Sequence, residues 1–301
     1  MARELPSPPR PPLPPRRLAL TTLLHHTYGK GRVRVARVLR RPDGRHEIRD
    51  LSVQAMMEGD FARLWTDGDN ARAVSTDTVK NVVNVVAREN LGLGNEAFCA
   101  AVARKLLDAY PQIGAATVTA HETRWARLAV DGAPHPHAFA LDGNGRPFAR
   151  VVARRGAPEA VESGVSGFSF LKTTASGWAG YDRDDPYTTL PWTEDRIAAT
   201  AMDATWAWRE APPDYGAANA TVLDTMLRVF ATTYSRSVQD SLYRMGGAAL
   251  EAVPQVERIA MAAPNKHYLL VNLERFGLDN DLAVFTATDE PHGQIECVVG
   301  R

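Results

Sequence analysis

The chain of 301 residues has few cysteines, few lysines and no long apolar segment. Its two cysteines, Cys99 and Cys297, can form at most one disulfide and make no Cys-x-x-Cys pair, which argues against a disulfide scaffold and favours a reducing compartment. A membrane-spanning helix is not expected, because no apolar run reaches about 18 residues. The 35 Lys and Arg residues balance the 35 Asp and Glu residues, so the basic excess typical of nucleic-acid-binding proteins is lacking.

Lysine is scarce among the cationic residues. Of the 35 cations five are lysines, which leaves 30 arginines. The lysines are Lys30, Lys80, Lys105, Lys172 and Lys266. Lys can release a proton when its surroundings lower its pKa, whereas Arg stays charged. Each lysine is therefore a candidate for chemistry that Arg cannot perform, although a solvated surface Lys is the ordinary interpretation of any single one.

The N-terminal segment differs from the rest of the chain. Residues 1–50 contain 12 Arg or Lys and 4 Asp or Glu, a net charge of +8, so the remainder sums to −8. Seven prolines lie within residues 1–17, which favours polyproline-like or disordered chain. We expect a Pro- and Arg-rich disordered tail over residues 1–24. It has no apolar segment of a secretory signal, and its PxxP spacing is a weak indication of a peptide ligand.

A weak internal sequence repeat indicates duplication. At an offset of 143 residues Pro111-Gln112 recurs as Pro254-Gln255, and Trp65 falls on Trp208. Each half contains strands, two helices, the Pro-Gln pair and further strands in the same order. The sequence predicts a first repeat over residues 25–157 and a second over residues 158–301.

The apolar spacing within each repeat predicts its elements. In the first repeat we expect a helix capped by Thr76, a helix over 95–109, and a strand over 117–128 that leads to a hairpin turn at Asp131-Gly132. Valines at helical spacing form the buried face of the first helix: Val79, Val82, Val83 and Val86. In the second repeat, apolar positions over 222–230 and 238–249 predict two helices, and strands are expected over 268–273 and 294–299.

These elements predict an α+β fold of two tandem repeats, each an antiparallel sheet with paired helices on one face. An open four-stranded sheet leaves unpaired edges. Joining the sheets of several subunits into a barrel would close those edges, so an oligomer is expected.

The remaining indications of function come from short polar segments within apolar stretches, which we call polar islands, and not from familiar catalytic motifs. The chain has no Gly-rich phosphate loop, His-Glu-x-x-His pair or Gly-x-Ser-x-Gly turn. Its islands precede expected strands or begin expected helices, where capping or turn chemistry is the ordinary interpretation. They are Tyr28-Gly29-Lys30, Thr76-Asp77, Asp195-Arg196, Ser237-Val238-Gln239 and Pro264-Asn265-Lys266-His267.

In these islands and their order, the sequence resembles urate oxidase, the cofactor-independent uricase family of the tunnelling-fold (T-fold) superfamily, over about residues 27–301. Further segments carry the same resemblance, among them Leu171-Lys172-Thr173-Thr174 and Tyr187-Thr188-Thr189-Leu190. The resemblance implies that Lys30 and Thr76 form a proton relay assisted by His267. Lys30 fits this role because an Arg there could not act as a base. The resemblance further implies that the ring of Trp178, where the family usually has Phe, stacks on the substrate.

The remaining roles implied by the resemblance concern binding of urate and oxygen. Arg196 would grip one edge of the flat anion with its planar fork, and Gln239 with the Val238 backbone would read the opposite edge. Asp77 would offer its backbone amide. Asn265 and Thr76 would hold dioxygen or water above the ring. Leu190 would form an apolar wall.

Structural interpretations compete with several of these roles. Thr76 can act only as a helix cap, Arg196 can form a surface ion pair with Asp195 or Glu194, and His267 can be an ordinary strand histidine. His135 and His137 invite a metal-site interpretation, but the flanking prolines favour a structural turn.

The implied activity is oxidation of urate by O2 and water to 5-hydroxyisourate and H2O2, with no metal or organic cofactor. The implied partners are urate, O2 and further copies of the chain in a homotetramer with active sites at subunit interfaces, without nucleic acid or membrane. The ending Val299-Gly300-Arg301 is not a peroxisomal address, so we expect a cytoplasmic, bacterial-type enzyme. Two alternatives stay open: another tunnelling-fold enzyme acting on a pterin or purine ring, and a scaffold that recruits partners through its tail.

Overall fold

The computed structural model describes residues 21–301. Residues 1–20 of the predicted tail lie outside the described residues. The strands are β1 (Tyr28–Arg40), β2 (His46–Gly59), β3 (Ile113–Val130), β4 (Ala133–Asp142), β5 (Arg146–Arg154), β6 (Ala160–Lys172), β7 (Ala198–Trp208), β8 (Val256–Leu270) and β9 (Phe285–Gly300). The helices are α1 (Ala62–Thr66), α2 (Thr76–Glu89), α3 (Asn95–Ala109), α4 (Tyr215–Thr232), α5 (Val238–Ala252) and the short 3-10 helix η1 (Glu274–Phe276).

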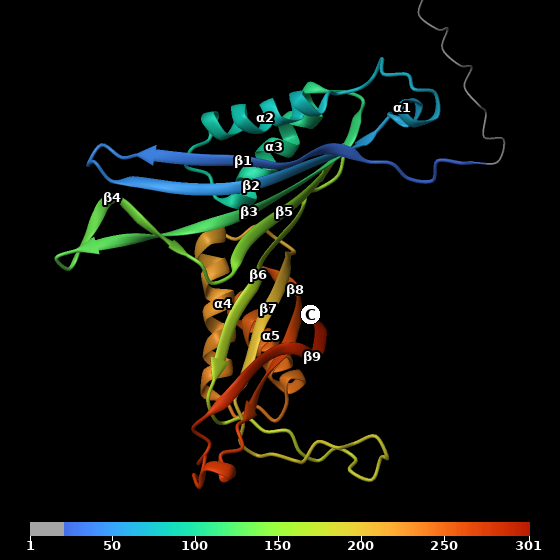
Figure 1. The fold of residues 1–301 in the computed structure, drawn as a ribbon. Helices are drawn as coiled ribbons and strands as arrows, with labels where there is room; N and C mark the ends of the chain where they lie inside the picture. The colour runs from blue at the N-terminus through green and yellow to red at the C-terminus, as the bar shows by residue number, and fades with distance from the viewer. Residues whose placement is uncertain (1–20) are drawn as a thin grey trace, which may run out of the picture.

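The strands form one antiparallel sheet in the order β1-β2-β3-β5-β6-β7-β8-β9, with β4 paired to β3 as a hairpin. Instead of two separate four-stranded sheets, the repeats share a continuous sheet, because β5 pairs with β6. The outer strands of this path are β1 and β9. Figure 1 shows α2 and α3 lying along the first half of the sheet and α4 and α5 along the second half. The expected α+β architecture of tandem repeats is confirmed.

Each repeat has its own hydrophobic core. One cluster of buried residues runs from Val33 to Ala153, and the other from Val165 to Ala263. Val79, Val83 and Val86 of α2 are fully buried, as their spacing predicts, whereas Val82 is half-buried. The boundary predicted at residues 157–158 stays a prediction; it falls between the two clusters.

A buried polar cluster joins the two repeats. Glu96 of α3 is only 4% exposed, and it accepts hydrogen bonds from Ser163 Oγ at 2.6 Å and Asn219 Nδ2 at 2.8 Å. Trp208 Nε1 donates to Ser163 Oγ at 2.8 Å, and Trp206 Nε1 donates to Asn219 Oδ1 at 2.9 Å. Because a buried carboxylate is costly without such donors, the cluster fixes α3 relative to β6 and α4.

The expected helix cap at Thr76 is wrong by one residue. Ser75 is the N-cap of α2: its extended backbone and its Oγ, which accepts from the Thr78 N–H at 3.1 Å, fulfil that role. Thr76 is the first residue of the helix. Ser and Thr cap almost equally well, so a Ser-Thr pair does not specify which of them does so.

Strand ends also differ from the prediction. Tyr28-Gly29-Lys30 and Pro264–His267 lie inside β1 and β8 rather than before strands. The strand expected over 268–273 ends at Leu270. The hairpin turn at Asp131-Gly132 is confirmed, since both residues have positive φ, 51° and 78°. Among the described helices none is long and apolar enough to cross a membrane.

Candidate active site

The first group of candidate residues consists of Lys30 on β1 and of Thr76 and Asp77 on α2. The register between β1 and β2 shifts between Lys30 and Val33, and Arg32 has a φ of 54°, so a bulge follows Lys30 directly. At Gly29 a Cβ would lie 1.9 Å from the carbonyl oxygen of Ala55. Only glycine allows this approach of β1 to β2, and the Gly29-Lys30 pair therefore sets where the lysine leaves the sheet.

Thr76 and Asp77 lie on the exposed first turn of α2. The Asp77 carboxylate pairs with Lys80 and accepts from Asn81 Nδ2 at 3.1 Å. The hydrogen bond from Lys80 is the main reason that the pKa of Asp77 is lowered, and the charge of Lys30 contributes less. Because first-turn N–H groups have no partner within their helix, this turn offers the backbone amide that Asp77 is predicted to supply.

The second group lies on the connection of residues 173–197 between β6 and β7, which carries Trp178, Leu190 and Arg196. Main-chain hydrogen bonds tie this connection to the segment before α5. Gly177 N donates to Ser235 O at 2.9 Å, and Ser235 N donates to Ala175 O at 2.9 Å. Within the connection, Arg196 N donates to Ser176 O at 2.9 Å. We call segments 174–178, 193–196 and 233–237 together the loop junction.

Further main-chain and side-chain contacts hold the loop junction together. Trp178 and Thr193 exchange main-chain hydrogen bonds of 2.7 and 3.1 Å. The Tyr234 hydroxyl donates to Glu194 O at 2.7 Å. A Cβ at Gly177 would lie 2.3 Å from that hydroxyl oxygen. A side chain at residue 177 would therefore displace the Tyr234 hydroxyl from its place in the junction.

Arg196 is a partly buried cation. Within residues 21–301 it forms no ion pair with Asp195 or Glu194; the Asp195 carboxylate instead accepts from Thr174 Oγ1 at 2.8 Å. Arg196 Nε is buried and has no hydrogen-bond partner among the described atoms. Burial lowers the pKa of this guanidinium. The ion-pair interpretation is therefore wrong, and an unpartnered buried donor is suited to an anionic ligand.

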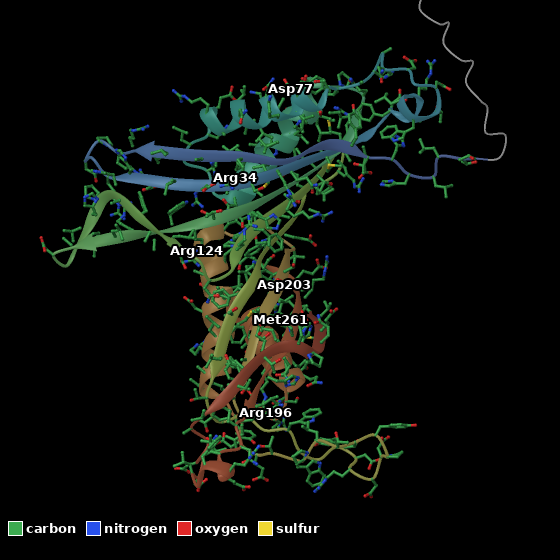
Figure 2. The ribbon with its side chains drawn as sticks, in the orientation of Figure 1. Arg34, Asp77, Arg124, Arg196, Asp203 and Met261 are labelled. Carbon is green, nitrogen blue, oxygen red and sulfur yellow. The ribbon has the colours of Figure 1, made fainter. Side chains whose placement is uncertain are left out.

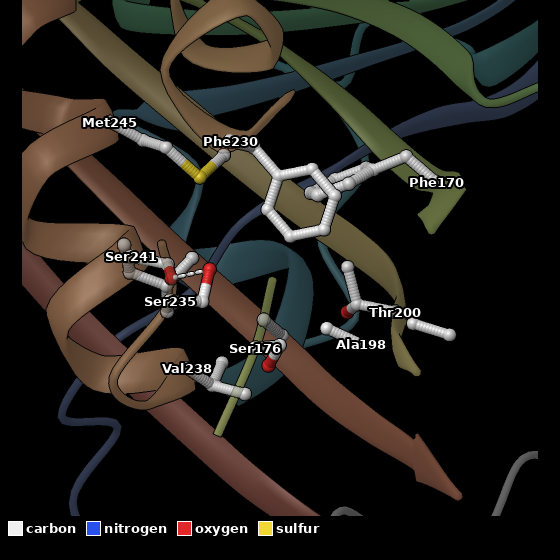
Figure 3. A pocket seen from close by; sticks show the side chains of 12 residues that line it. Phe170, Ser176, Ala198, Thr200, Phe230, Ser235, Val238, Ser241 and Met245 are labelled. Atoms are coloured by element: carbon white, nitrogen blue, oxygen red, sulfur yellow. Dashed lines mark hydrogen bonds between the residues drawn. The ribbon is translucent and has the colours of Figure 1, made fainter. Parts of the chain in front are cut away.

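Val238 and Gln239 begin α5, directly beside the loop junction. Ser237 caps this helix by accepting from the Asp240 N–H at 3.0 Å, and Gln239 is exposed. Figure 3 shows Val238 and Ser176 at the edge of a small cavity, with Ser235 and Ser241 hydrogen-bonded to each other at 2.7 Å. This mostly apolar cavity of about 20 Å³ separates the junction from the core of the second repeat.

Asn265 and His267 lie within β8 where its pairing with β9 is irregular. Asn265 is opposite Gly293 and His267 is opposite Thr288, with a register shift between them. Both residues are half-buried. Residues two apart in a strand normally share a face, and the register shift marks a local irregularity of the β8–β9 pairing at these two residues.

Trp178 is held by an aromatic neighbour. Its ring stacks on Tyr181 with centroids 5.5 Å apart and an angle of 22° between the planes. The Tyr181 hydroxyl donates to Leu190 O at 2.6 Å, and Trp192 Nε1 donates to Tyr181 O at 3.1 Å. Trp178, Tyr181 and Leu190 line one shallow hollow, so the predicted aromatic platform and apolar wall lie close together.

The two groups lie far apart within one chain. Asp77, on the first turn of α2, and Arg196, before β7, are at opposite ends of the molecule (Figure 2). A single copy therefore brings together Trp178, Leu190, Arg196 and Val238, and separately Lys30 with Thr76 and Asp77. It does not bring the first group to the second.

The predicted turn at His135 and His137 is wrong, because both lie in strand β4. Their rings contact each other edge to face, with centroids 4.6 Å apart. Among residues 21–301 no cluster of three His, Cys, Asp or Glu side chains is arranged to hold a metal ion.

Sequence reasoning missed the residues that support the second group. Ser235 and Gly177 act through main-chain hydrogen bonds, and Tyr234 acts through its hydroxyl. All three contact segments distant in sequence, and nothing in their local pattern indicates this. In the sequence Lys172 stands out only as one of five lysines and as part of a segment that resembles the family; in the structure it lies at the root of the 173–197 connection.

These features define a duplicated antiparallel α+β protein whose candidate residues collect at the ends of its repeats. The sequence model of the uricase family matches residues 26–152 and 161–296. A uricase from Arthrobacter globiformis is 38% identical over 274 residues, covering 91% of this chain and 88% of the relative. One from Dictyostelium discoideum is 33% identical, covering 94% and 98%. The chain belongs to the uricase family.

A solved structure agrees with this assignment. The crystal structure of the Arthrobacter globiformis uricase superposes with a TM-score of 0.87 at 37% identity, covering 93% of this chain and 95% of that one. The fold is therefore the tunnelling fold of the uricases.

Proposed function

We propose that the chain is a urate oxidase of purine catabolism, which converts urate, O2 and water to 5-hydroxyisourate and H2O2. Arg196 is the observation that carries this proposal: a partly buried guanidinium with an unpartnered Nε, at the end of a loop that also presents an aromatic ring. A planar anion with acceptors along one edge matches that fork.

The second group would hold the substrate. Arg196 binds one edge of urate, Gln239 and the Val238 amide bind the other, and Trp178 stacks on its face while Leu190 excludes water. Fixing the ring in one pose beside oxygen lowers the entropic part of the barrier, and the rigid loop junction supplies the necessary order.

The first group would move protons. Lys30 accepts a proton through the Thr76 hydroxyl, which leaves urate electron-rich, and the Asp77 amide steadies the developing charge. Asn265 and His267 lie on β8, where Lys266 pairs with Ala199 close to Arg196, at the end of the second group. Asn265 would hold O2 together with Thr76 of a neighbouring copy, and His267 would assist proton transfer. Urate gives two electrons to O2, which leaves as H2O2, and water supplies the oxygen added to the ring; no external reductant is needed.

The separation of the two groups supports a shared site. In a homotetramer the Lys30 and Thr76 end of one copy would face the Trp178 and Arg196 end of its neighbour, and the free edges at β1 and β9 would pair between copies to close a barrel. We propose this assembly, with each active site at a subunit interface.

Two further points belong to the proposal. The reaction uses no metal or organic cofactor, and the enzyme acts in the cytoplasm without nucleic acid or membrane. Both described cysteines are free, in keeping with a reducing compartment.

The test is the loss of urate absorbance together with the appearance of peroxide, with and without a metal chelator. Turnover that the chelator does not affect is expected. No turnover of urate contradicts the function and leaves the pterin or purine enzyme or the scaffold, whereas inhibition by the chelator contradicts the cofactor-free reaction.

Subunit complementation tests the shared site. Lys30→Met and Arg196→Gln copies are each expected to retain little activity. Co-refolding equal amounts should restore about a quarter of the wild-type activity, because a random pairing of intact halves occurs at that frequency. No restoration in assembled mixed oligomers would contradict an interface site.

A further inference from the structure

Lys172 is the last residue of β6 and pairs with Ala198, the first residue of β7. The connection that carries Trp178 and Arg196 therefore begins and ends at this pair. Any group that fixes Lys172 also fixes the root of that connection.

The Lys172 ammonium binds the C-terminal end of α4. Its Nζ donates to Thr233 O at 2.7 Å and to Phe230 O at 3.1 Å, and lies 4.9 Å from the centre of the Phe230 ring. The last carbonyls of a helix lack partners within the helix and carry its negative end. The cation thus satisfies acceptors that would otherwise be bare.

These carbonyls lead directly into the loop junction. Thr233 is the C-cap of α4, and Ser235, two residues later, exchanges main-chain hydrogen bonds with Ala175 and Gly177. Ser237 then caps α5, which begins with Val238 and Gln239. The Lys172 ammonium therefore links the root of the 173–197 connection to the segment that leads into Val238 and Gln239.

The choice of Lys in a chain rich in Arg has a steric reason. The Lys ammonium carries its three N–H donors on one small nitrogen. It can therefore donate to two carbonyls while it lies beside an aromatic ring. A planar guanidinium is wider and directs its donors into a fixed fork. Burial also lowers the pKa of Lys172, which agrees with an enclosed contact.

We propose that Lys172 is a positioning residue for substrate: it holds the Trp178 and Arg196 side of the site in register with the Val238 and Gln239 side. This inference rests on the proposed function for its ligand, and on the hydrogen bonds above for its geometry.

The experiment compares Lys172→Met with Lys105→Met. Lys105 is a matched control, because its Nζ pairs at 2.7 Å with Glu89 on the exposed surface of the first repeat. Urate binding is measured without oxygen, by quenching of tryptophan fluorescence, and turnover is measured in air. For K172M we expect the Kd and KM for urate to rise about tenfold or more, with a smaller fall in kcat and an unchanged oligomer; K105M should match wild type.

Hydrogen exchange gives a second readout that does not need urate. The amides of Gly177, Ser235 and Arg196 should exchange faster in K172M, while those of α2 and α3 stay protected. Should K172M fail to fold, Lys172→Gln, which keeps a neutral donor, undergoes the same measurements.

The outcomes separate the two proposals. Wild-type protein that neither binds nor oxidises urate contradicts the proposed function, yet faster exchange in the variant still supports the positioning role. A folded variant with unchanged urate affinity and unchanged exchange at the junction overturns the inference about Lys172. Faster exchange with unchanged affinity overturns its link to substrate.

Discussion

The two repeats connect their first two strands in different ways. In the first repeat residues 41–45 join β1 to β2 in a short turn, whereas in the second repeat residues 173–197 join β6 to β7. The short turn carries none of the candidate residues, and the long connection carries Trp178, Leu190 and Arg196. A duplicated framework can thus keep its sheet and helices in both copies while one connection is enlarged to bear chemistry.

The repeats also use opposite ends. In the first, the candidate residues lie where β1 and α2 begin; in the second, they lie where β6 ends, where α5 begins and within β8. The first group lies on strand and helix ends: Lys30 directly precedes a bulge in β1, and Thr76 is the first residue of α2. The second relies on the loop junction. The predictions below test whether the two ends differ in this way.

The largest effect is expected at the proton-handling end. Lys30→Arg keeps the charge but removes the base, so kcat for urate should fall about a thousandfold, within the range of general acid–base catalysis. Size-exclusion chromatography should show an unchanged oligomer. If the variant keeps near wild-type kcat, Lys30 is not part of the relay.

At the substrate-holding end, Arg196→Gln removes the planar cation and should lower kcat/KM about a hundredfold, as expected for loss of a charge-assisted, two-pronged contact. Anaerobic urate binding should weaken in parallel. Arg196→Lys should recover little, because a point charge cannot replace the fork. Full recovery by Lys would show that only charge matters.

A smaller effect is expected from the packing of the loop junction. Gly177→Ala places a methyl group against the Tyr234 hydroxyl, at 2.3 Å before relaxation, so its bond to Glu194 should break and KM should rise about tenfold, for a cost near 1.4 kcal/mol. Gly92→Ala is the control, because a Cβ there meets nothing within 4 Å. Equal kinetics for the two variants would contradict a rigid junction.

The smallest effect concerns acid stability beside the site. Arg236 donates a hydrogen bond to Asp240 at 2.5 Å, and this contact is the main cause of the lowered pKa of Asp240. A carboxyl whose pKa is lower folded than unfolded stabilises the fold above its unfolded pKa, and this stability is lost as pH falls through the folded pKa.

Asp240→Asn should therefore reduce the free energy of unfolding at pH 7 by at most about 1 kcal/mol, since Arg236 is largely exposed. The difference from wild type should shrink below about pH 4. Urea unfolding at several pH values measures it. A difference that grows as pH falls would contradict the assigned cause.

Regular elements were predictable where spacing alone decides burial. The helix over Asn95–Ala109 and the buried valines of α2 follow from periodicity, and the Asp131-Gly132 turn follows from the demand for positive φ. The candidate residues themselves came from resemblance, because single Lys, Thr or Arg residues have ordinary structural interpretations.

Other features depend on contacts that no local pattern contains. Ser75 rather than Thr76 caps α2, and two adjacent residues that can both cap leave this choice open in the sequence. The union of the two sheets through β5 and β6, and the loop junction, arise from main-chain hydrogen bonds between distant segments. Such bonds use groups that every residue has, so composition does not reveal them.

The Glu96 cluster has a consequence for how the molecule melts. Unfolding the second repeat alone would strip Glu96 of the donors from Ser163 and Asn219 and would also uncover the β5 edge of the first. Both penalties couple the repeats, so heat should produce one absorption peak in calorimetry rather than two. The duplicated chain is then a single cooperative unit, even though it contains two cores.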